Sequence, residues 1–334
     1  MSIYAIGAVC RDLVDGQYVP GSGVLYGGAA LLAQGQHINV ITKCNGRDLP
    51  MFDSIIRHPL TRTFSAKGAN KPTTEFENIY IDGTSNRVSV VHARTTEFTK
   101  DEIKSSVEED EDRIFIVTPL AGEFPAELLP FLRSDVAAKR IAVDVQGFTR
   151  HVNESNGTVE ITDWVEKEKY LSQIDALKID NKEALVLVGT DDILEASRVL
   201  LKMGVRDLIV ATCTEGVLFT RRKQQTQNLD QNTDQTSKAE PNQIKNDLQS
   251  DFSQSDDEYQ YEWRKWGPPL TPESRTGRGD TTFFSAVSLI YANSTDLKEA
   301  ATWTAKLVEA KMQHKGELLT QDVAKVKESI LIRK

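Results

Sequence analysis

The sequence predicts an α/β protein in which a mostly parallel sheet is covered by helices on both sides. Short apolar runs rich in Ile and Val recur along the chain, which is typical of buried strands. Segments with helical periodicity lie between these runs, and strands that alternate with helices indicate parallel pairing. The composition, 39% hydrophobic and 27% charged, is that of an ordinary globular protein, so collagen-like, coiled-coil and wholly disordered chains are excluded.

The elements follow from these runs in chain order. Two helices have clear boundaries: Asp191 is expected to cap a helix that ends at Gly204, and Asp296 with Glu299 forms an approximate capping box for another. The predicted strands are 3–9, 38–43, 113–118, 140–145, 176–179, 207–212, 216–222 and 261–266.

Two stretches depart from the alternation of strands and helices. Residues 75–93 predict two strands around a tight turn at Asp82-Gly83, and residues 15–26 are rich in glycine without helical period. We therefore expect one domain spanning 1–334, with a small β lid from about 12–26 and 75–93. Such pieces often close over the site of small-molecule enzymes, and an exposed strand edge can also pair with a second copy, which suggests a homodimer through the lid.

Residues 223–260 have a different composition. They are rich in Gln, Asn, Asp and Ser and contain few large apolar side chains. Such a segment cannot bury enough surface to offset its loss of conformational entropy on folding. We predict a disordered polar insertion between two strands.

Charge and cysteine content exclude several classes of protein. With 40 basic and 49 acidic residues the net charge is −9, which disfavours nucleic acid and anionic membranes as partners. Three scattered cysteines argue against a disulfide framework or a zinc site. The N-terminus lacks the pattern of a signal peptide and no apolar run approaches membrane-spanning length, so we expect a cytoplasmic protein.

The segment 274–286 carries the clearest chemical signal. Gly277 and Gly279 lie just before a predicted helix, where a flexible backbone and the positive end of the helix can together bind a phosphate. Asp280 at this point can accept a proton from an alcohol that attacks phosphorus. The structural alternative is a glycine turn with Asp280 as a simple N-cap. Neither a P-loop nor a dinucleotide-binding glycine motif is present.

Several short motifs, in their order along the chain, resemble those of the PfkB carbohydrate kinases, the ribokinase-like family, and especially its inositol-kinase-like branch. Thr276–Thr281 resembles the T-G-x-G-D signature, and Gly27-Gly28 resembles the N-terminal glycine pair. Asp144–Arg150 is similar to a D-x-Q-G-x-x-R stretch, Asp180–Glu183 to N-x-x-E, and Thr212–Gly216 to the nucleotide-binding T-x-G-x-x-G.

The resemblance implies a three-layer ribokinase-like α/β/α fold and ATP-dependent phosphorylation of a hydroxyl on a small sugar, cyclitol or nucleoside. Asp280 would be the general base, and Gly277, Arg278 and Gly279 would form the anion hole. The D-x-Q-G-x-x-R stretch favours a cyclitol or sugar over a nucleoside.

The resemblance also implies roles for other residues, each of which has a plain structural alternative in a turn, loop or helix terminus. The remaining implied site residues are Asp12, Gly27, Gly28, Gln146 and Arg150 for the substrate, Thr214 and Gly216 for ATP, and Asp180 and Glu183 for Mg²⁺.

The sequence departs from the family pattern in three places. Asp180 replaces an Asn, Cys213 replaces a Gly, and the segment between Gly28 and Ile38 is too short for the helix that the family has there. We therefore expect one wall of the substrate pocket to be trimmed. The short segment and the acidic insertion favour one alternative function, a non-catalytic ligand-binding sensor that kept the fold.

Overall fold

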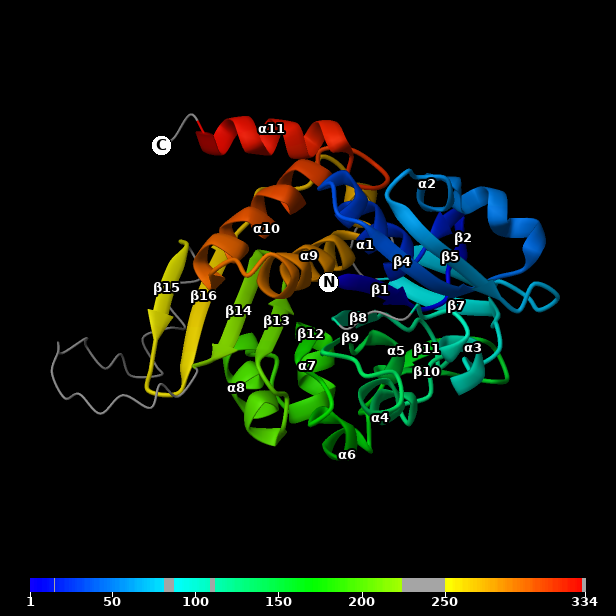
Figure 1. Cartoon of the computed structure of the whole chain (residues 1–334), viewed down its shortest axis with the longest axis horizontal. Helices are drawn as coiled ribbons and strands as arrows, with labels where there is room; N and C mark the ends of the chain where they lie inside the picture. The colour runs from blue at the N-terminus through cyan, green and yellow to red at the C-terminus, as the bar shows by residue number, and fades with distance from the viewer. Residues whose placement is uncertain (15, 81–86, 109–111, 224–249, 332–334) are drawn as a thin grey trace, which may run out of the picture.

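The computed structural model of the chain describes residues 1–14, 16–80, 87–108, 112–223 and 250–331. A ten-stranded sheet forms its centre, in the order β15-β16-β14-β13-β12-β9-β8-β1-β4-β5 (Figure 1). The strands from β13 to β5 pair in parallel, and β14, β16 and β15 continue one edge in antiparallel pairing. The predicted mostly parallel α/β fold is therefore confirmed.

The strands of this sheet are short and mainly buried, because Ile, Val and Leu dominate them and helices cover both faces. Their bounds are β1 Ser2–Ile6, β4 Ile38–Lys43, β5 Thr61–Lys67, β8 Arg113–Val117, β9 Arg140–Asp144, β12 Ala176–Asp180, β13 Leu208–Thr212, β14 Gly216–Arg222, β15 Phe252–Ser255 and β16 Tyr259–Lys265.

Helices form a layer on each face of the sheet (Figure 1). One layer contains α1 Gly23–Ala33, α9 Arg278–Val287, α10 Leu297–Lys311 and α11 Thr320–Leu331, and the other contains α4 Leu128–Ser134, α6 Lys167–Leu171, α7 Asn181–Val188 and α8 Ile193–Met203. Two large hydrophobic clusters correspond to these layers. Asp192, not Asp191, caps α8. No helix within the described ranges is long and apolar enough to cross a membrane.

Shorter helices connect the strands. They are α2 Asp53–Ile56, α3 Lys100–Lys104, α5 Gln146–Thr149, the 3-10 helices Gly46–Phe52 and Pro272–Arg275, and a π-helical turn, Ser288–Ala292, that continues α9.

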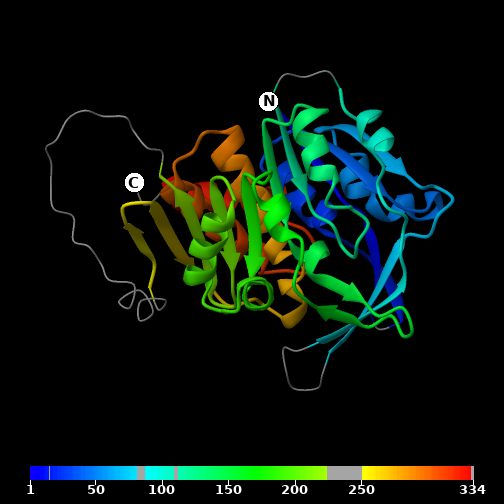
Figure 2. The ribbon, with the colours of Figure 1, turned by 90° about the horizontal axis from the view of Figure 1, so that it is seen from below.

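A second sheet of four strands, in the order β3-β2-β6-β7, projects from the α/β body (Figure 2). Its strands are β2 Cys10–Val14, β3 Gln17–Gly21, β6 Thr74–Tyr80 and β7 Arg87–Ala93. A short ribbon of β10 Arg150–Val152 and β11 Val159–Ile161 lies nearby. The predicted turn at Asp82-Gly83 lies outside the described residues.

The start of α1 corrects two sequence predictions. The predicted lid segment 12–26 ends at Gly21, because Ser22 caps a helix by accepting a hydrogen bond from the Leu25 amide at 3.1 Å. The segment before Ile38 is therefore not trimmed, since α1 begins upstream of the glycine pair and supplies a full helix. Position 27 within this helix is glycine because α9 packs closely against it: a Cβ on Gly27 would lie 2.2 Å from the Phe284 ring.

The predicted disordered insertion is also wrong in its last part. Residues 224–249 lie outside the described residues, but Phe252–Ser255 forms β15 and pairs with β16. Arg264 explains the pairing, because its buried guanidinium donates to the Phe252 carbonyl at 2.9 Å and to the Ser253 hydroxyl at 3.4 Å. Phe252 itself packs against the core.

Candidate active site

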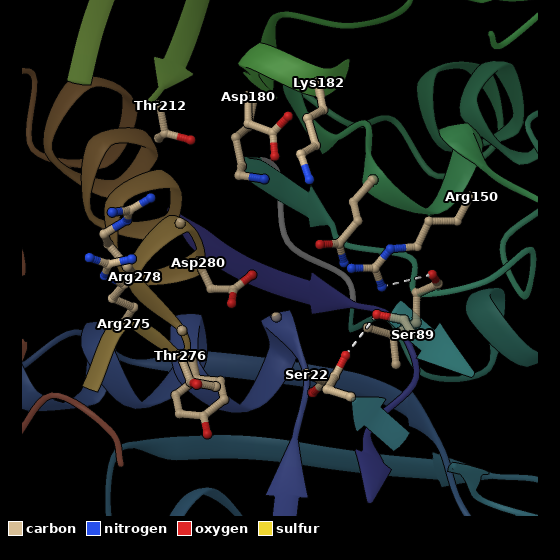
Figure 3. Close-up of a pocket in the computed structure, with 18 of the residues that line it drawn as sticks. Ser22, Ser89, Arg150, Asp180, Lys182, Thr212, Arg275, Thr276, Arg278 and Asp280 are labelled. Atoms are coloured by element: carbon tan, nitrogen blue, oxygen red, sulfur yellow. Dashed lines mark hydrogen bonds between the residues drawn. The ribbon is translucent and has the colours of Figure 1, made fainter. Parts of the chain in front are cut away.

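A cleft of about 870 Å³ opens at the carboxyl ends of the parallel strands, beside the second sheet. Ligands of open α/β sheets bind at this end of the strands. Asp280 points into the cleft, whose other lining side chains we describe as two halves (Figure 3). We name them the cationic half, lined by Asp180, Lys182, Thr212, Thr214, Arg275 and Arg278, and the lid half, lined by Asp12, Ser22, Asn78, Ser89, Gln146 and Arg150.

The first turn of α9 faces the cleft with unused backbone amides. Gly277 is the N-cap in the left-handed conformation, with φ 77°, and no side chain caps the helix. Within the described ranges, the amides of Arg278 and Gly279 donate to no protein group. A Cβ at position 277 would lie 2.3 Å from the Tyr26 ring, so glycine is required by both φ and space. The geometry is that of an anion-binding helix terminus.

Asp280 lies in the same turn and lines the cleft (Figure 3). Its carboxylate is close to the start of α1, since a Cβ on Gly23 would lie 2.9 Å from Oδ1 of Asp280. Burial and the neighbouring Asp144 raise the pKa of Asp280 to about 6, although Lys178 and two other cations oppose this. At neutral pH the carboxylate is therefore mostly ionised and able to accept a proton.

Lys178, which the sequence analysis missed, is a buried cation beside the anion-binding turn. It donates to Asp144 at 3.0 Å, and its Cε lies 3.0 Å from where a Cβ on Gly279 would be. Burial lowers the pKa of this lysine, but Asp144 and other carboxylates outweigh burial and raise it above the ordinary value. A charged residue within the apolar run 176–179 was the available signal, because such a residue is rarely buried without a partner.

Asp180 and Glu183, predicted to hold Mg²⁺, form a capping box at the start of α7. Asp180 accepts from the Glu183 amide at 2.9 Å, and Glu183 accepts from the Asp180 amide at 2.7 Å. Asp180 lines the cleft, whereas Glu183 is 4% exposed and lies behind it. The structural alternative therefore accounts for the position of Glu183.

The lid half collects polar groups from distant parts of the chain. Asp12, Gln146 and Arg150, which the resemblance implies for the substrate, line it. Two residues that the sequence analysis missed, Asn78 on β6 and Ser89 on β7, line it as well, and the Ser89 hydroxyl donates to Asn78 at 2.7 Å. Only the pairing of the two lid strands brings them together.

Three predicted glycines do not line the cleft. Gly27 and Gly28 are buried within α1, where they allow close approach of Phe284 and Ile38. Gly216 lies at the start of β14, where a Cβ would lie 2.3 Å from the Arg264 carbonyl oxygen. All three serve packing, whereas Thr214, which the resemblance implies for ATP, lines the cleft.

The cationic half combines three basic side chains: Lys182 follows β12, and Arg275 and Arg278 flank the anion-binding turn (Figure 3). The guanidinium of Arg278 lies over the Trp266 ring, 5.0 Å from its centroid. This half carries no large aliphatic or aromatic side chain on the segments 180–182, 212–214 and 275–278, although the Tyr26 ring packs against Gly277 beside it. It is suited to a small, highly charged anion.

The fold and the cleft together define a ribokinase-like phosphotransferase, with an anion-binding turn beside a carboxylate. Comparison with known proteins supports this class. The sequence matches no family model and no curated protein. Solved structures do match, and those similar to this chain include pyrophosphate-dependent kinases, one of them described as a member of the ribokinase family.

One similar structure is a pyrophosphate-dependent kinase of the ribokinase family with a pyrophosphate analog and myo-inositol, at 26% identity and TM-score 0.73, covering 96% of this chain and 99% of that one. Another is a pyrophosphate-dependent myo-inositol-1 kinase converted into a myo-inositol-3 kinase by N78L/S89L, at 25% identity and TM-score 0.74, covering 98% and 99%. Ribokinase of Arabidopsis thaliana with ribose and ATP shares the fold at 14% identity and TM-score 0.63, covering 97% and 98%. The predicted family and enzyme class are confirmed.

Proposed function

We propose that the protein phosphorylates a hydroxyl of myo-inositol or a closely related cyclitol, with pyrophosphate as the phosphoryl donor. The composition of the cationic half carries the proposal. It offers Lys182, Arg275 and Arg278 to a polyanion, and the segments that carry these cations hold no large apolar side chain against which an adenine could stack. The similar pyrophosphate-dependent inositol kinases support the same donor and acceptor.

The order of groups along the cleft suggests how the reaction proceeds. The acceptor hydroxyl lies beside Asp280, which takes its proton as the oxygen attacks the nearer phosphorus of pyrophosphate. A new P–O bond to the acceptor forms, the bridging P–O bond breaks, and its electron pair leaves on orthophosphate. The free amides of Arg278 and Gly279 stabilise the negative charge on the transferred group.

Magnesium fits this site only as an ion carried largely by the donor. The described part of the chain has no cluster of three or more metal-ligating side chains. Asp180 lines the cationic half and would contribute one carboxylate oxygen to a Mg²⁺ that is otherwise held by phosphate oxygens and water. Bound there, the ion would neutralise charge on the phosphates.

The lid half supports a polyhydroxy acceptor. Carboxylate, amide, guanidinium and hydroxyl groups from Asp12, Gln146, Arg150 and Ser89 face the same space, which suits a ring that carries a hydroxyl on every carbon. Asn78 and Ser89 occupy the numbers whose substitution in the similar inositol kinase changes the hydroxyl that is phosphorylated. We propose that this pair orients the ring here.

The proposal is tested by assaying purified protein with myo-inositol and either pyrophosphate or ATP, with product identified by ³¹P NMR. We expect inositol phosphate and orthophosphate with pyrophosphate, and turnover at least tenfold slower with ATP. Faster turnover with ATP would refute the donor proposal and favour the second candidate donor, to which Thr214 in the cleft would contribute. Turnover of a sugar or nucleoside but not of inositol would refute the acceptor.

Substitution of the acceptor side gives a second test. The double variant Asn78→Leu/Ser89→Leu is expected to retain pyrophosphate cleavage but to phosphorylate a different hydroxyl, because it removes the polar contacts of one edge of the ring. Ser253→Leu, a matched Ser-to-Leu change on β15, is expected to leave the product unchanged. An unchanged product from the double variant would show that the pair does not orient the ring.

A further inference from the structure

A buried lysine lies directly behind the anion-binding turn. Lys311 is the last residue of α10 and its side chain is fully buried. Its Nζ donates to the carbonyl oxygen of Ser274 at 2.7 Å and to that of Thr276. It also lies over the ring of Tyr26, 5.7 Å from the centroid. One ammonium group thus links α10, the approach to α9, and α1.

We infer that Lys311 is a positioning residue for phosphoryl transfer, whose ammonium group fixes the peptide planes that lead into the anion-binding turn. The inference rests on the proposed function, in which that turn holds the transferred phosphoryl group.

Peptide geometry connects Lys311 to the turn. The carbonyl of Thr276 and the N–H of Gly277 belong to one rigid plane and point in opposite directions. When Lys311 holds the Thr276 oxygen, the Gly277 N–H is turned away from Lys311 and the left-handed start of α9 is fixed. Without the ammonium group, the carbonyl oxygens of Ser274 and Thr276 would face an apolar gap without a hydrogen-bond donor. The peptide plane between Thr276 and Gly277 would then no longer be held in this orientation.

The electrostatic setting gives Lys311 a second effect. No carboxylate among the described residues lies within ion-pair distance of it, so burial lowers its pKa to about 8, with Arg278 acting in the same direction and Asp280 in the opposite one. Its charge in turn helps to keep Asp280 ionised. Tyr26, the titratable group packed against it from α1, has a pKa raised above its ordinary value by burial. Deprotonation of Lys311 is therefore expected to define an alkaline limb of activity near pH 8.

Kinetics of Lys311→Met test the inference, because methionine keeps the length of the side chain without its charge. We expect kcat to fall by about tenfold to hundredfold, less than the about 10²–10³-fold cost of removing an oxyanion donor, with KM for the acceptor within about twofold. The alkaline limb should disappear. Lys298→Met, on the exposed first turn of the same helix, should behave as the wild type. A wild-type kcat, or a retained limb near pH 8, would overturn the inference.

Chemical rescue separates positioning from plain support of the fold. Lys311→Ala would leave two carbonyl oxygens facing a hole of cation size, which K⁺ or ammonium can enter. Ammonium chloride should restore kcat severalfold, whereas tetramethylammonium chloride at equal ionic strength should not. A folded variant that neither salt restores would contradict the inference. If the variant does not fold, the methionine variant decides.

A measurement without substrate keeps the inference separate from the proposed function. In protein labelled with ¹⁵N-glycine, the amide signals of Gly277 and Gly279 should shift with pH around 8 in the wild type and not in Lys311→Met. Persistence of that titration in the variant would overturn the role of Lys311. A wild type that shows the titration but does not phosphorylate inositol would refute only the proposed function.

Discussion

Two helices, α7 and α9, begin at the same cleft, but the backbone amides of their first turns differ in their hydrogen-bond partners. At α7 the side chains of Asp180 and Glu183 accept hydrogen bonds from each other's amides. At α9 the N-cap is Gly277, and no side chain replaces the missing partners. The first amides of every helix need a partner from outside the helix. The protein's own side chains thus satisfy the amides at the start of α7, whereas the first amides of α9 are left for a ligand.

This difference in capping indicates that the anion binds at the N-terminus of α9 rather than at that of α7. A side-chain cap is worth about 0.5–2 kcal/mol, so an uncapped terminus in a well-packed helix forgoes stability unless something else binds there. Two of the three cations of the cationic half, Arg275 and Arg278, and the Asp280 carboxylate lie at the start of α9, whereas the third, Lys182, lies in the first turn of α7. The uncapped end is therefore the reactive one, and variants at each end can break or sharpen this contrast.

The largest effect is expected at Asp280. Asp280→Asn keeps the size of the side chain but cannot accept the acceptor's proton, so kcat should fall by about 10²–10⁴-fold. Inositol affinity, measured by calorimetry, should change by less than about threefold. Asp296→Asn, the same change at the exposed N-cap of α10, should leave both quantities unchanged. A kcat of Asp280→Asn within threefold of the wild type would remove Asp280 from the mechanism.

The next effect is expected at Gly277. Alanine there would be strained at φ 77° and would collide with Tyr26, so the amides of the turn would move, and we expect kcat to fall by about 10²–10³-fold. Gly189, the C-cap of α7, has φ 80° with open space around it. Gly189→Ala should therefore cost about 1–2 kcal/mol in unfolding experiments without loss of kcat. Equal kcat losses in both variants would mean that backbone strain, rather than the anion hole, explains the result.

The fold was largely predictable because its signals are local. Apolar runs located eight of the ten strands of the central sheet, all except β5 and β15, and the T-G-x-G-D motif located the turn at the start of α9. The start of α1 was not predictable, because glycine disfavours a helix by about 1 kcal/mol and the packing contact that offsets this cost comes from another part of the chain. Phe284, far away in sequence, supplies that contact.

The site was predictable only where one motif holds several of its residues. Asp280 and the anion-binding turn are consecutive in sequence. Asn78 and Ser89 meet only through the pairing of β6 with β7, and Lys178 comes from β12 in the other sheet. Gly216 was misassigned because a glycine that serves packing and a glycine that serves a ligand look alike in sequence.

A smaller effect is expected from pH, and it follows from the raised pKa of Asp280. The base acts in its ionised form, so protonation removes activity as the pH falls through the pKa of about 6. We expect log kcat/KM with inositol to fall by about one unit per pH unit below 6 and to level off above it. The acid limb should be absent from the residual activity of Asp280→Asn. A limb that starts near pH 4, the ordinary range for Asp, would show that burial does not control this carboxyl.

The smallest effect is expected at the capped helix end. Asp180→Asn keeps a good N-cap, so the free energy of unfolding should change by less than about 0.5 kcal/mol, whereas Asp180→Ala removes the cap and should cost about 1 kcal/mol. If Asp180 is also a ligand of donor-bound Mg²⁺, both variants need more Mg²⁺ for half-maximal rate, and by a similar factor, because each lacks the carboxylate. A Mg²⁺ requirement that changes only in Asp180→Ala would indicate that Asp180 serves the cap alone, and the contrast between the two helix ends would then be complete.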